Sequence, residues 1–233
     1  MIDCVHGRRL VVAIDGPAGA GKSTIAGELA RALGYVLLDT GALYRAVALA
    51  AQQQGVAWDD TEGVARLAVR LARADELRLE PAPHGVRVVL FGDDVGAAIR
   101  TAEMSMGASR VSAIPGVRAA LLELQRATGR QGGVIAEGRD IGTVVFPSAD
   151  VKFFVTASIE VRAERRCAEL LARGERADLQ SVRAEVIARD RQDSERSVAP
   201  LRHADDARLV DTSGRTVSDI VAELRRIVET AAR

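Results

Sequence analysis

The sequence predicts an α/β fold in which helices flank a parallel sheet. Short apolar runs rich in Val and Ile recur along the 233 residues, and amphipathic helical stretches separate them. The first run leads directly into a glycine-rich sequence and then into a helix-forming stretch, as in phosphate-binding proteins. The composition, 48% hydrophobic, allows a substantial core in one domain with an inserted lobe or in two small domains.

The expected elements alternate along the chain. The apolar runs predicted as strands are 10–14, 35–38, 133–136, 151–155 and 207–211. The predicted helices are about 22–33, 41–54, 61–73, 114–128, 158–172, 178–193 and 216–230. Three helix starts carry local signals: Ser158 followed by Glu160, Pro115 at a first helical position, and a Thr216-x-x-Asp219 capping box.

Residues 57–107, between the second and third runs, break this alternation. A helix is followed by Leu77-Arg78-Leu79-Glu80, a turn at 81–85 and then the segment 86–91, which predicts an antiparallel hairpin on an inserted lobe. Such a lobe, hinged on a phosphate-binding core, could clamp a substrate. It could also be a purely structural insertion.

Composition excludes several classes of function. The 32 basic and 32 acidic residues balance, so no global basic field would hold a nucleic-acid polymer or an anionic membrane. Two cysteines and three scattered histidines indicate neither a disulfide framework nor a zinc site. There is no apolar stretch of about 18 residues, and the first run is too short for a signal peptide. A cytoplasmic enzyme is expected, as a monomer because no association surface is evident.

Residues 16–23 read Gly-Pro-Ala-Gly-Ala-Gly-Lys-Ser and match the G-x-x-x-x-G-K-[ST] phosphate-binding loop. The glycines let backbone N–H groups face inward, and the following helix N-terminus adds partial positive charge. Lys22 is expected to reach the β and γ phosphates, and Ser23 to offer its hydroxyl to Mg²⁺. The chain has only one other lysine, Lys152, so the point charge at position 22 looks selected for its site. The loop predicts binding of a nucleoside triphosphate.

A second substrate is indicated at the ends of two further runs. In a parallel sheet, residues just after the strands face a common crevice, which places Asp39, Tyr44 and Arg45 beside the phosphate loop. Arg139 and Asp140 follow the third run in the same way. Each residue alone has an ordinary interpretation: Asp39 could cap a helix, Tyr44 could lie in the core, Arg45 could be solvated, and Arg139 and Asp140 could form a local pair.

Arginines near the C-terminal half of the chain could contribute to the same crevice. Arg189, Asp193 and Arg196 are spaced i, i+4 and i+7, which puts them on one helix face where Arg189 and Asp193 can pair. In isolation this pattern is usually a solvated face with ion pairs. A further cluster near Gly174, comprising Arg162, Arg165, Arg166 and Arg173, could fold over the donor or could be plain surface charge.

Four segments together carry a family resemblance. They are Ile14 to Thr24, Asp39 to Arg45, Glu137 to Pro147, and Arg189 to Arg196 followed by Val198-Ala-Pro200. In order and spacing the chain resembles bacterial cytidylate (CMP) kinases from about residue 10 to 230. The resemblance implies a single domain, 1–233, with the P-loop nucleoside monophosphate kinase fold: a five-stranded parallel core (about 9–56 and 108–233), an inserted monophosphate-binding lobe (about 57–107) and a short lid (about 165–180). The implied reaction is ATP + (d)CMP → ADP + (d)CDP.

The resemblance also implies residue roles. ATP would be bound by Gly16, Pro17, Ala18, Gly19, Ala20, Gly21, Lys22, Ser23 and Thr24, with Mg²⁺ entering with ATP and contacting Ser23. CMP would be bound by Asp39, Tyr44, Arg45, Ser109, Arg118, Arg139, Asp140, Arg189, Asp193 and Arg196. Within this set, Ser109, Arg118 and Asp140 would read cytosine. The catalytic cations would be Lys22, Arg45, Arg139 and Arg189, and phosphoryl transfer of this kind needs no general base.

Two alternatives remain open from the sequence. A kinase of another monophosphate, such as UMP or AMP, would use the same loop. A nucleotide-dependent switch would also use it, but the chain lacks an Asn-Lys-x-Asp guanine-reading motif, and the arginines that converge on a second anion site favour transfer. ADP formation with each monophosphate offered in turn would separate these possibilities.

Overall fold

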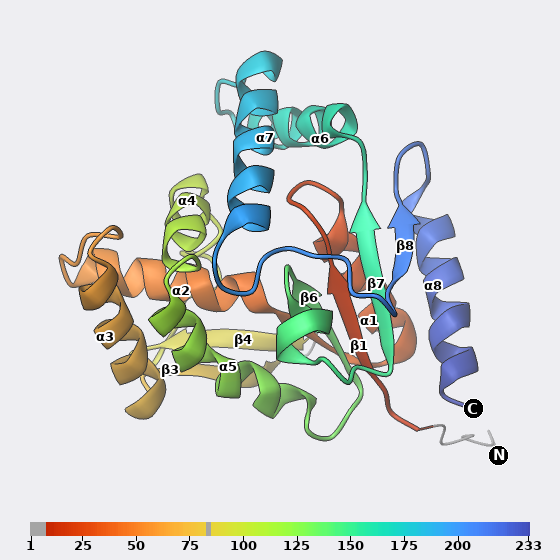
Figure 1. Ribbon diagram of the computed structural model, residues 1–233, viewed down its shortest axis with the longest axis horizontal. Helices are drawn as coiled ribbons and strands as arrows, with labels where there is room; N and C mark the ends of the chain where they lie inside the picture. The colour runs from red at the N-terminus through yellow and green to blue at the C-terminus, as the bar shows by residue number, and fades with distance from the viewer. Residues whose placement is uncertain (1–7, 83–84) are drawn as a thin grey trace.

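The computed structural model describes residues 8–82 and 85–233, which form two sheets flanked by helices (Figure 1). The larger sheet has five parallel strands in the order β2-β6-β1-β7-β8. They are β1 (Val11–Asp15), β2 (Val36–Asp39), β6 (Val134–Gly138), β7 (Val151–Thr156) and β8 (Arg208–Asp211). The predicted five-stranded parallel sheet is therefore confirmed, and all its carboxyl ends lie at one edge.

Seven helices lie within two residues of their predicted bounds. They are α1 (Lys22–Leu33), α2 (Thr40–Gln53), α3 (Thr61–Arg73), α5 (Pro115–Gly129), α6 (Ile159–Ala172), α7 (Leu179–Glu195) and α8 (Val217–Ala231). The expected start signals are present. Ser158 and Thr216 are the N-cap residues of α6 and α8, and the side chain of each accepts a hydrogen bond from a backbone N–H of its helix; Pro115 is the first residue of α5. Among the described residues, no helix combines the length and apolar character needed to cross a membrane.

The hairpin predicted in the inserted region is confirmed by β3 (Leu77–Ala82) and β4 (Gly85–Leu90), which pair antiparallel. The predicted turn at 81–85 is too long, because Pro81 and Ala82 still belong to β3 and Gly85 already belongs to β4; residues 83–84 lie outside the described residues. Strand β5 (Asp93–Asp94) and helix α4 (Ala102–Val111) were not predicted. The sequence of α4 is rich in small residues and has a weak apolar pattern. This helix packs closely on α2 because Gly107 has no side chain. A Cβ atom at this position would lie 2.7 Å from the Cβ of Ala48.

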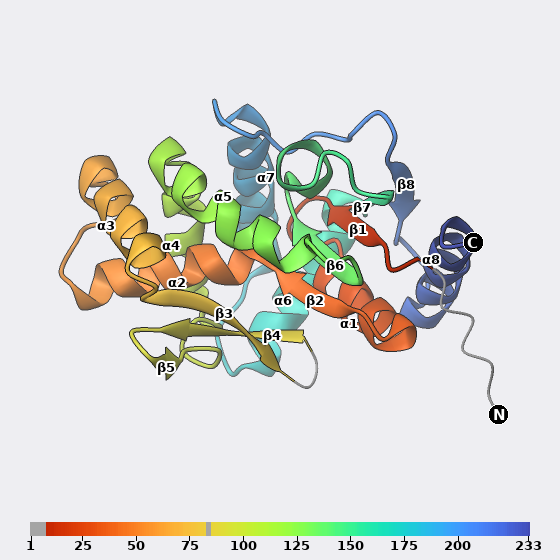
Figure 2. The same cartoon turned by 90° about the horizontal axis from the view of Figure 1, so that it is seen from below.

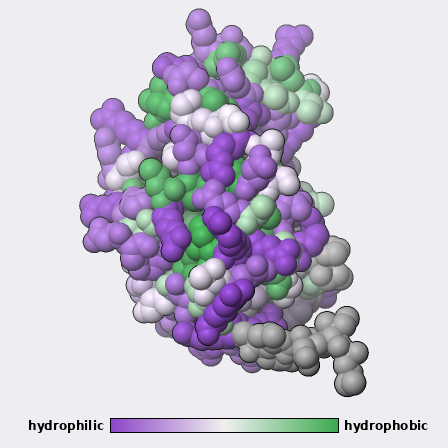
Figure 3. Space-filling view, turned by 90° about the vertical axis from the view of Figure 1, so that its right-hand side faces the viewer, coloured by the Kyte–Doolittle hydropathy of each residue, from purple (hydrophilic) through white to green (hydrophobic). Residues whose placement is uncertain are grey.

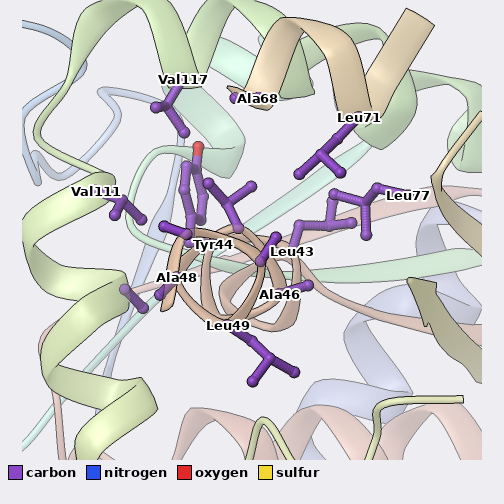
Figure 4. Close-up of a cluster of buried hydrophobic side chains, with 14 of the residues drawn as sticks. Leu43, Tyr44, Ala46, Ala48, Leu49, Ala68, Leu71, Leu77, Val111 and Val117 are labelled. Atoms are coloured by element: carbon purple, nitrogen blue, oxygen red, sulfur yellow. The ribbon is translucent and has the colours of Figure 1, made fainter. Parts of the chain in front are cut away.

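An apolar core centred on α2 joins the inserted region to the rest of the protein. Figure 4 shows α2 end-on, with Leu43, Tyr44 and Leu49 projecting from it and Val111 and Val117 facing it from neighbouring helices. The core includes side chains from α3, β3, β4, α4 and α5. Figure 2 shows the small sheet lying against one side of α2. The inserted region is therefore continuous with the core through α2 and α5.

Helices α6 and α7 form a hairpin beyond the carboxyl ends of the strands (Figure 1). A small cluster that includes Ala163, Leu170 and Val182 holds these two helices together. Helix α8, which follows the edge strand β8, packs against α1. The face of the molecule on the side of β8 and α8 is mostly hydrophilic (Figure 3).

Candidate active site

A cavity of about 670 Å³ opens at the carboxyl edge of the five-stranded sheet. Residues 18–24 of the phosphate loop line one end of it. All the predicted acceptor residues line the same cavity: Asp39, Tyr44, Arg45, Ser109, Arg118, Arg139, Asp140, Arg189, Asp193 and Arg196. Gly16 and Pro17 form the root of the loop, outside the lining. The structure thus brings together residues that are separated by up to about 180 positions in the sequence.

The phosphate loop has the predicted backbone geometry. Gly16, Gly19 and Gly21 all have positive φ, and a Cβ on Gly16 would lie 1.9 Å from the carbonyl oxygen of Val155. Gly21 is the N-cap of α1, and it makes no side-chain cap hydrogen bond to the helix. The first N–H groups of α1 are therefore open toward the cavity, where an anion would satisfy them.

Lys22 and Glu137 are buried at the phosphate end of the cavity. The Nζ atom of Lys22 donates to the carbonyl oxygen of Pro17 at 2.7 Å, and the Oγ atom of Ser23 donates to Glu137 at 2.9 Å. Burial, followed by the nearby charge of Arg139, lowers the pKa of Lys22 to about 7. Burial also raises the pKa of Glu137 to about 7. Each group is therefore close to losing its charge in the free protein.

Sequence reasoning gave no role to Glu137 or to Asp15. Asp15, the last residue of β1, accepts hydrogen bonds from the N–H groups of Ile141 and Gly142, both at 2.7 Å. These residues begin η1 (Ile141–Val145), a π-helical turn that directly follows Asp140. Burial raises the pKa of Asp15 to about 6, although the two N–H groups oppose this shift. The signal available in the sequence was a carboxylate at the carboxyl end of each of two buried strands.

Asp39 both caps helix α2 and holds Arg45, and both side chains line the cavity. Asp39 is the N-cap of α2, where Oδ1 accepts from the N–H of Ala42 at 3.1 Å, and its Oδ2 accepts from Arg45 at 2.6 Å. The Nε atom of Arg45 is buried and has no hydrogen-bond partner among the described residues. Asp39 thus orients the side chain of Arg45, which lines the cavity.

The predicted pair between Arg189 and Asp193 is wrong. Asp193 instead accepts from the Nε atom of Arg139 at 2.7 Å, and the Nε atom of Arg189 is buried without a partner in the described parts of the chain. The i, i+4 spacing favours a pair on a solvated helix surface, but this face of α7 points into the cavity, where Arg139 arrives from the end of β6. Burial disfavours the charge of Asp193, yet Arg139 holds the pKa of its carboxyl below the usual range. Burial and the charge of Arg139 lower the pKa of Arg189 to about 10.

Asp140 lies between two arginines at the other end of the cavity. It forms a buried ion pair with Arg118, and the Nη2 atom of Arg196 lies 3.4 Å from its Oδ1 atom. The guanidinium of Arg118 also stacks over the ring of Tyr44, 5.4 Å from its centroid. Tyr44 is therefore both part of the apolar core and part of the cavity wall. Ser109, near the end of α4, is held by hydrogen bonds to Gln192.

The four arginines of the cluster near Gly174 have different surroundings. Arg162 is buried, binds Asp190 of α7 through two hydrogen bonds of 2.6 and 2.9 Å, and donates to the carbonyl oxygen of Ala18 at 3.2 Å. It therefore ties α7 to the phosphate loop. Arg165 and Arg166 line the cavity, whereas Arg173 forms an exposed pair with Glu169.

Comparison with known proteins agrees with this geometry. The sequence matches the family described as Cytidylate kinase over residues 12–230. A cytidylate kinase of Geobacter sp. (strain M21) is 50% identical over 220 residues, which cover 94% of this chain and 93% of that relative. Cytidylate kinases of Syntrophotalea carbinolica and Geobacter sulfurreducens are each 50% identical, and the alignments cover 95% and 97% of this chain and 92% and 96% of those relatives. The matched range contains every residue that lines the cavity.

Proposed function

This chain belongs to the cytidylate kinase family, which phosphorylates CMP with ATP, and we propose that the cavity described above performs this reaction on both CMP and dCMP. The products are ADP and CDP or dCDP. The observation that supports this proposal most strongly is that one cavity joins a complete phosphate loop to a ring of arginines: Arg45, Arg118, Arg139, Arg189 and Arg196. The extension to dCMP rests on the resemblance of the motifs.

ATP would occupy the phosphate-loop end. Its phosphates would bind the open N–H groups of α1 and the ammonium of Lys22. Ser23 and Glu137 place a hydroxyl and a carboxylate together there, and such hard oxygen donors fit Mg²⁺, which usually binds through few protein ligands together with substrate phosphates. No larger group of metal-ligating side chains occurs among residues 8–82 and 85–233, which agrees with a metal that enters with ATP. Bound Mg²⁺ would shield the phosphate charges.

The acceptor phosphate would bind between Arg45 and Arg189. Both side chains line the cavity, and a guanidinium group matches phosphate oxygens with paired N–H donors. Arg139 lies close enough to Arg189 for its positive charge to lower the pKa of that group. It therefore adds a third cation to this part of the cavity. Phosphoryl transfer depends mainly on alignment and on neutralisation of charge, and these side chains supply both.

The base and sugar would occupy the end lined by Asp140 and Asp193. Cytosine presents a donor at position 4 and an acceptor at N3, and uracil reverses both. The acceptor oxygens of Asp140 and the donors of Arg118, fixed by their mutual ion pair, match the cytosine pattern. Asp193, held by Arg139, supplies an acceptor for sugar hydroxyls.

The test is ADP formation by the purified enzyme with CMP, dCMP, UMP, AMP and GMP offered separately. We expect CMP and dCMP to be preferred. ADP release that is equally fast without a monophosphate, or fastest with AMP, would contradict the proposal.

We also propose that the enzyme acts in the cytoplasm. We propose that it is a monomer, because one chain supplies the whole cavity lining. Sedimentation of the active enzyme tests the monomer.

A further inference from the structure

Two hydrogen bonds connect Ser109, near the end of α4, to Gln192 of α7. The Oγ atom of Ser109 lies 3.1 Å from the amide oxygen of Gln192, and the amide nitrogen of Gln192 lies 3.1 Å from the carbonyl oxygen of Ser109. In Figure 1, α4 lies next to the lower part of α7. Ser109 also lines the cavity, together with Arg118 and Asp140.

The chemistry of these groups fixes the direction of both bonds. A backbone carbonyl can only accept, so the amide group beside it must present its nitrogen. That orientation turns the amide oxygen of Gln192 toward the hydroxyl of Ser109. An amide oxygen also only accepts, so the hydroxyl must donate its single proton to Gln192. Only lone pairs then remain on the Oγ atom for a ligand in the cavity.

We propose that Gln192 is a positioning residue that makes the Ser109 hydroxyl an obligate acceptor and thereby strengthens the preference for CMP over UMP. This inference rests on the proposed function and on the family resemblance, which implies that Ser109 reads cytosine together with Arg118 and Asp140. A free serine hydroxyl can donate or accept and would tolerate either base. With its proton committed, the hydroxyl can accept from the 4-amino group of cytosine but meets the 4-oxo group of uracil with lone pair against lone pair.

The expected effect is moderate. Gln192 is exposed on α7, so water competes for its hydrogen bonds. Removing the acceptor should let the hydroxyl rotate and donate to uracil, which corresponds to about a 3- to 10-fold change in discrimination. Because the side chain is exposed, substitutions there should leave the fold intact.

The experiment compares two substitutions of similar size in the full-length enzyme. Gln192→Leu removes both the acceptor of the hydroxyl and the donor to the Ser109 carbonyl, whereas Gln192→Glu loses the donor but keeps an oxygen that can accept from the hydroxyl. We expect Gln192→Leu to raise kcat/KM for UMP about 3- to 10-fold relative to CMP, and Gln192→Glu to retain the original ratio. Gln180→Leu makes the same change on an exposed residue of α7 about three turns away and should not alter the ratio.

Ser109→Ala separates failure of this inference from failure of the proposed function. If the unmodified enzyme does not phosphorylate CMP, the proposed function fails. If it does, and Ser109→Ala changes the CMP-to-UMP ratio while Gln192→Leu does not, the inference about Gln192 is wrong. A proportional loss for both substrates in Gln192→Leu, or a change of the ratio in Gln192→Leu but not in Ser109→Ala, would also overturn it.

Discussion

The donor and acceptor halves of the cavity are built in different ways. The donor half is built mainly from one continuous segment, the phosphate loop and the start of α1, with Glu137 beside it. The acceptor half is assembled from side chains of α2, α4, α5, α7 and the residues after β6. Many of these side chains hold one another: Asp39 holds Arg45, Arg139 holds Asp193, and Arg118 holds Asp140.

This difference predicts different responses to substitution. A site made of backbone depends on few side chains, so its effects should concentrate on Lys22, the one charged side chain of the loop. In a site made of mutual ion pairs, the effect of one substitution extends to the neighbouring residue, because removing one partner leaves the charge of the other buried and uncompensated. Acceptor variants should therefore change specificity and kcat/KM for CMP more than they change the use of ATP.

The largest effect is expected from Lys22→Ala. It removes the cation nearest the transferred group and should lower turnover about 10²-fold or more at saturating ATP and CMP, with the fold intact. Steady-state kinetics and thermal unfolding measure the two quantities. Near-normal turnover would refute the role of the loop lysine.

Lys152→Ala is the matched control for Lys22→Ala. Lys152 is the only other lysine and is also buried, but it bonds to Pro147 and Asp206 away from the cavity. Its removal should cost about 1–3 kcal/mol of stability and leave kcat within a few-fold. A large loss of turnover in both variants would mean that lysine burial, and not phosphate contact, explains the effect.

The next effect is expected from Arg118→Met in the acceptor half. Loss of the guanidinium leaves Asp140 with Arg196 as its remaining cation and removes the donors that match cytosine. We expect kcat/KM for CMP to fall roughly 30-fold, which corresponds to a loss of about 2 kcal/mol of transition-state stabilisation. The preference for CMP over UMP should become smaller. Equal proportional losses for both substrates would show that Arg118 does not read the base.

Much of the fold and the donor half could be predicted from the sequence because their signals are local. Apolar runs, helix-start residues and the contiguous loop each specify structure within a few residues. Helix α4 was missed although Thr101 is a local helix-start residue, and its packing depends on Gly107 approaching Ala48 and Trp58, which lie outside this helix. Likewise, η1 depends on Asp15, 126 positions before Ile141.

The acceptor half shows the same limit more sharply. The family motifs identified which residues line the cavity, but helix spacing gave Asp193 the wrong partner. Pairing inside a cavity depends on which side chain arrives from a distant strand, and that information is not in the local periodicity. The hydrogen bonds of Glu137 and Gln192 were missed for the same reason, because their partners lie 114 and 83 positions away.

Asp193→Ala should have a smaller effect than Arg118→Met. It removes the proposed acceptor for sugar hydroxyls and frees Arg139, and we expect kcat/KM for CMP and dCMP to fall about 10-fold with little change in ATP affinity. Titration calorimetry with ATP and kinetics with both monophosphates would measure this. A small stability loss beside unchanged acceptor kinetics would mean that the pair is only structural.

The smallest effect is a pH dependence that should be confined to the donor half. In the free enzyme, burial and Arg139 hold the pKa of Lys22 near 7, so its charge is lost as the pH rises through that value. Bound phosphates favour the charged form and should raise this pKa. Because kcat/KM reports the free enzyme and kcat reports the complex, kcat/KM for ATP should fall about fivefold between about pH 7 and 8 while kcat stays level.

The control for this pH dependence is Lys22→Arg, whose guanidinium stays charged throughout the range. Whatever its absolute rate, this variant should lose the alkaline fall in kcat/KM for ATP that Lys22 causes, and a fall that remains would come from Glu137, whose pKa is also about 7. At saturating ATP, kcat/KM for CMP should not show the fall in the unmodified enzyme, because Lys22 is then already paired with phosphate. A fall of equal size for ATP and CMP would place the titrating group in the acceptor half and would break the distinction between the two halves.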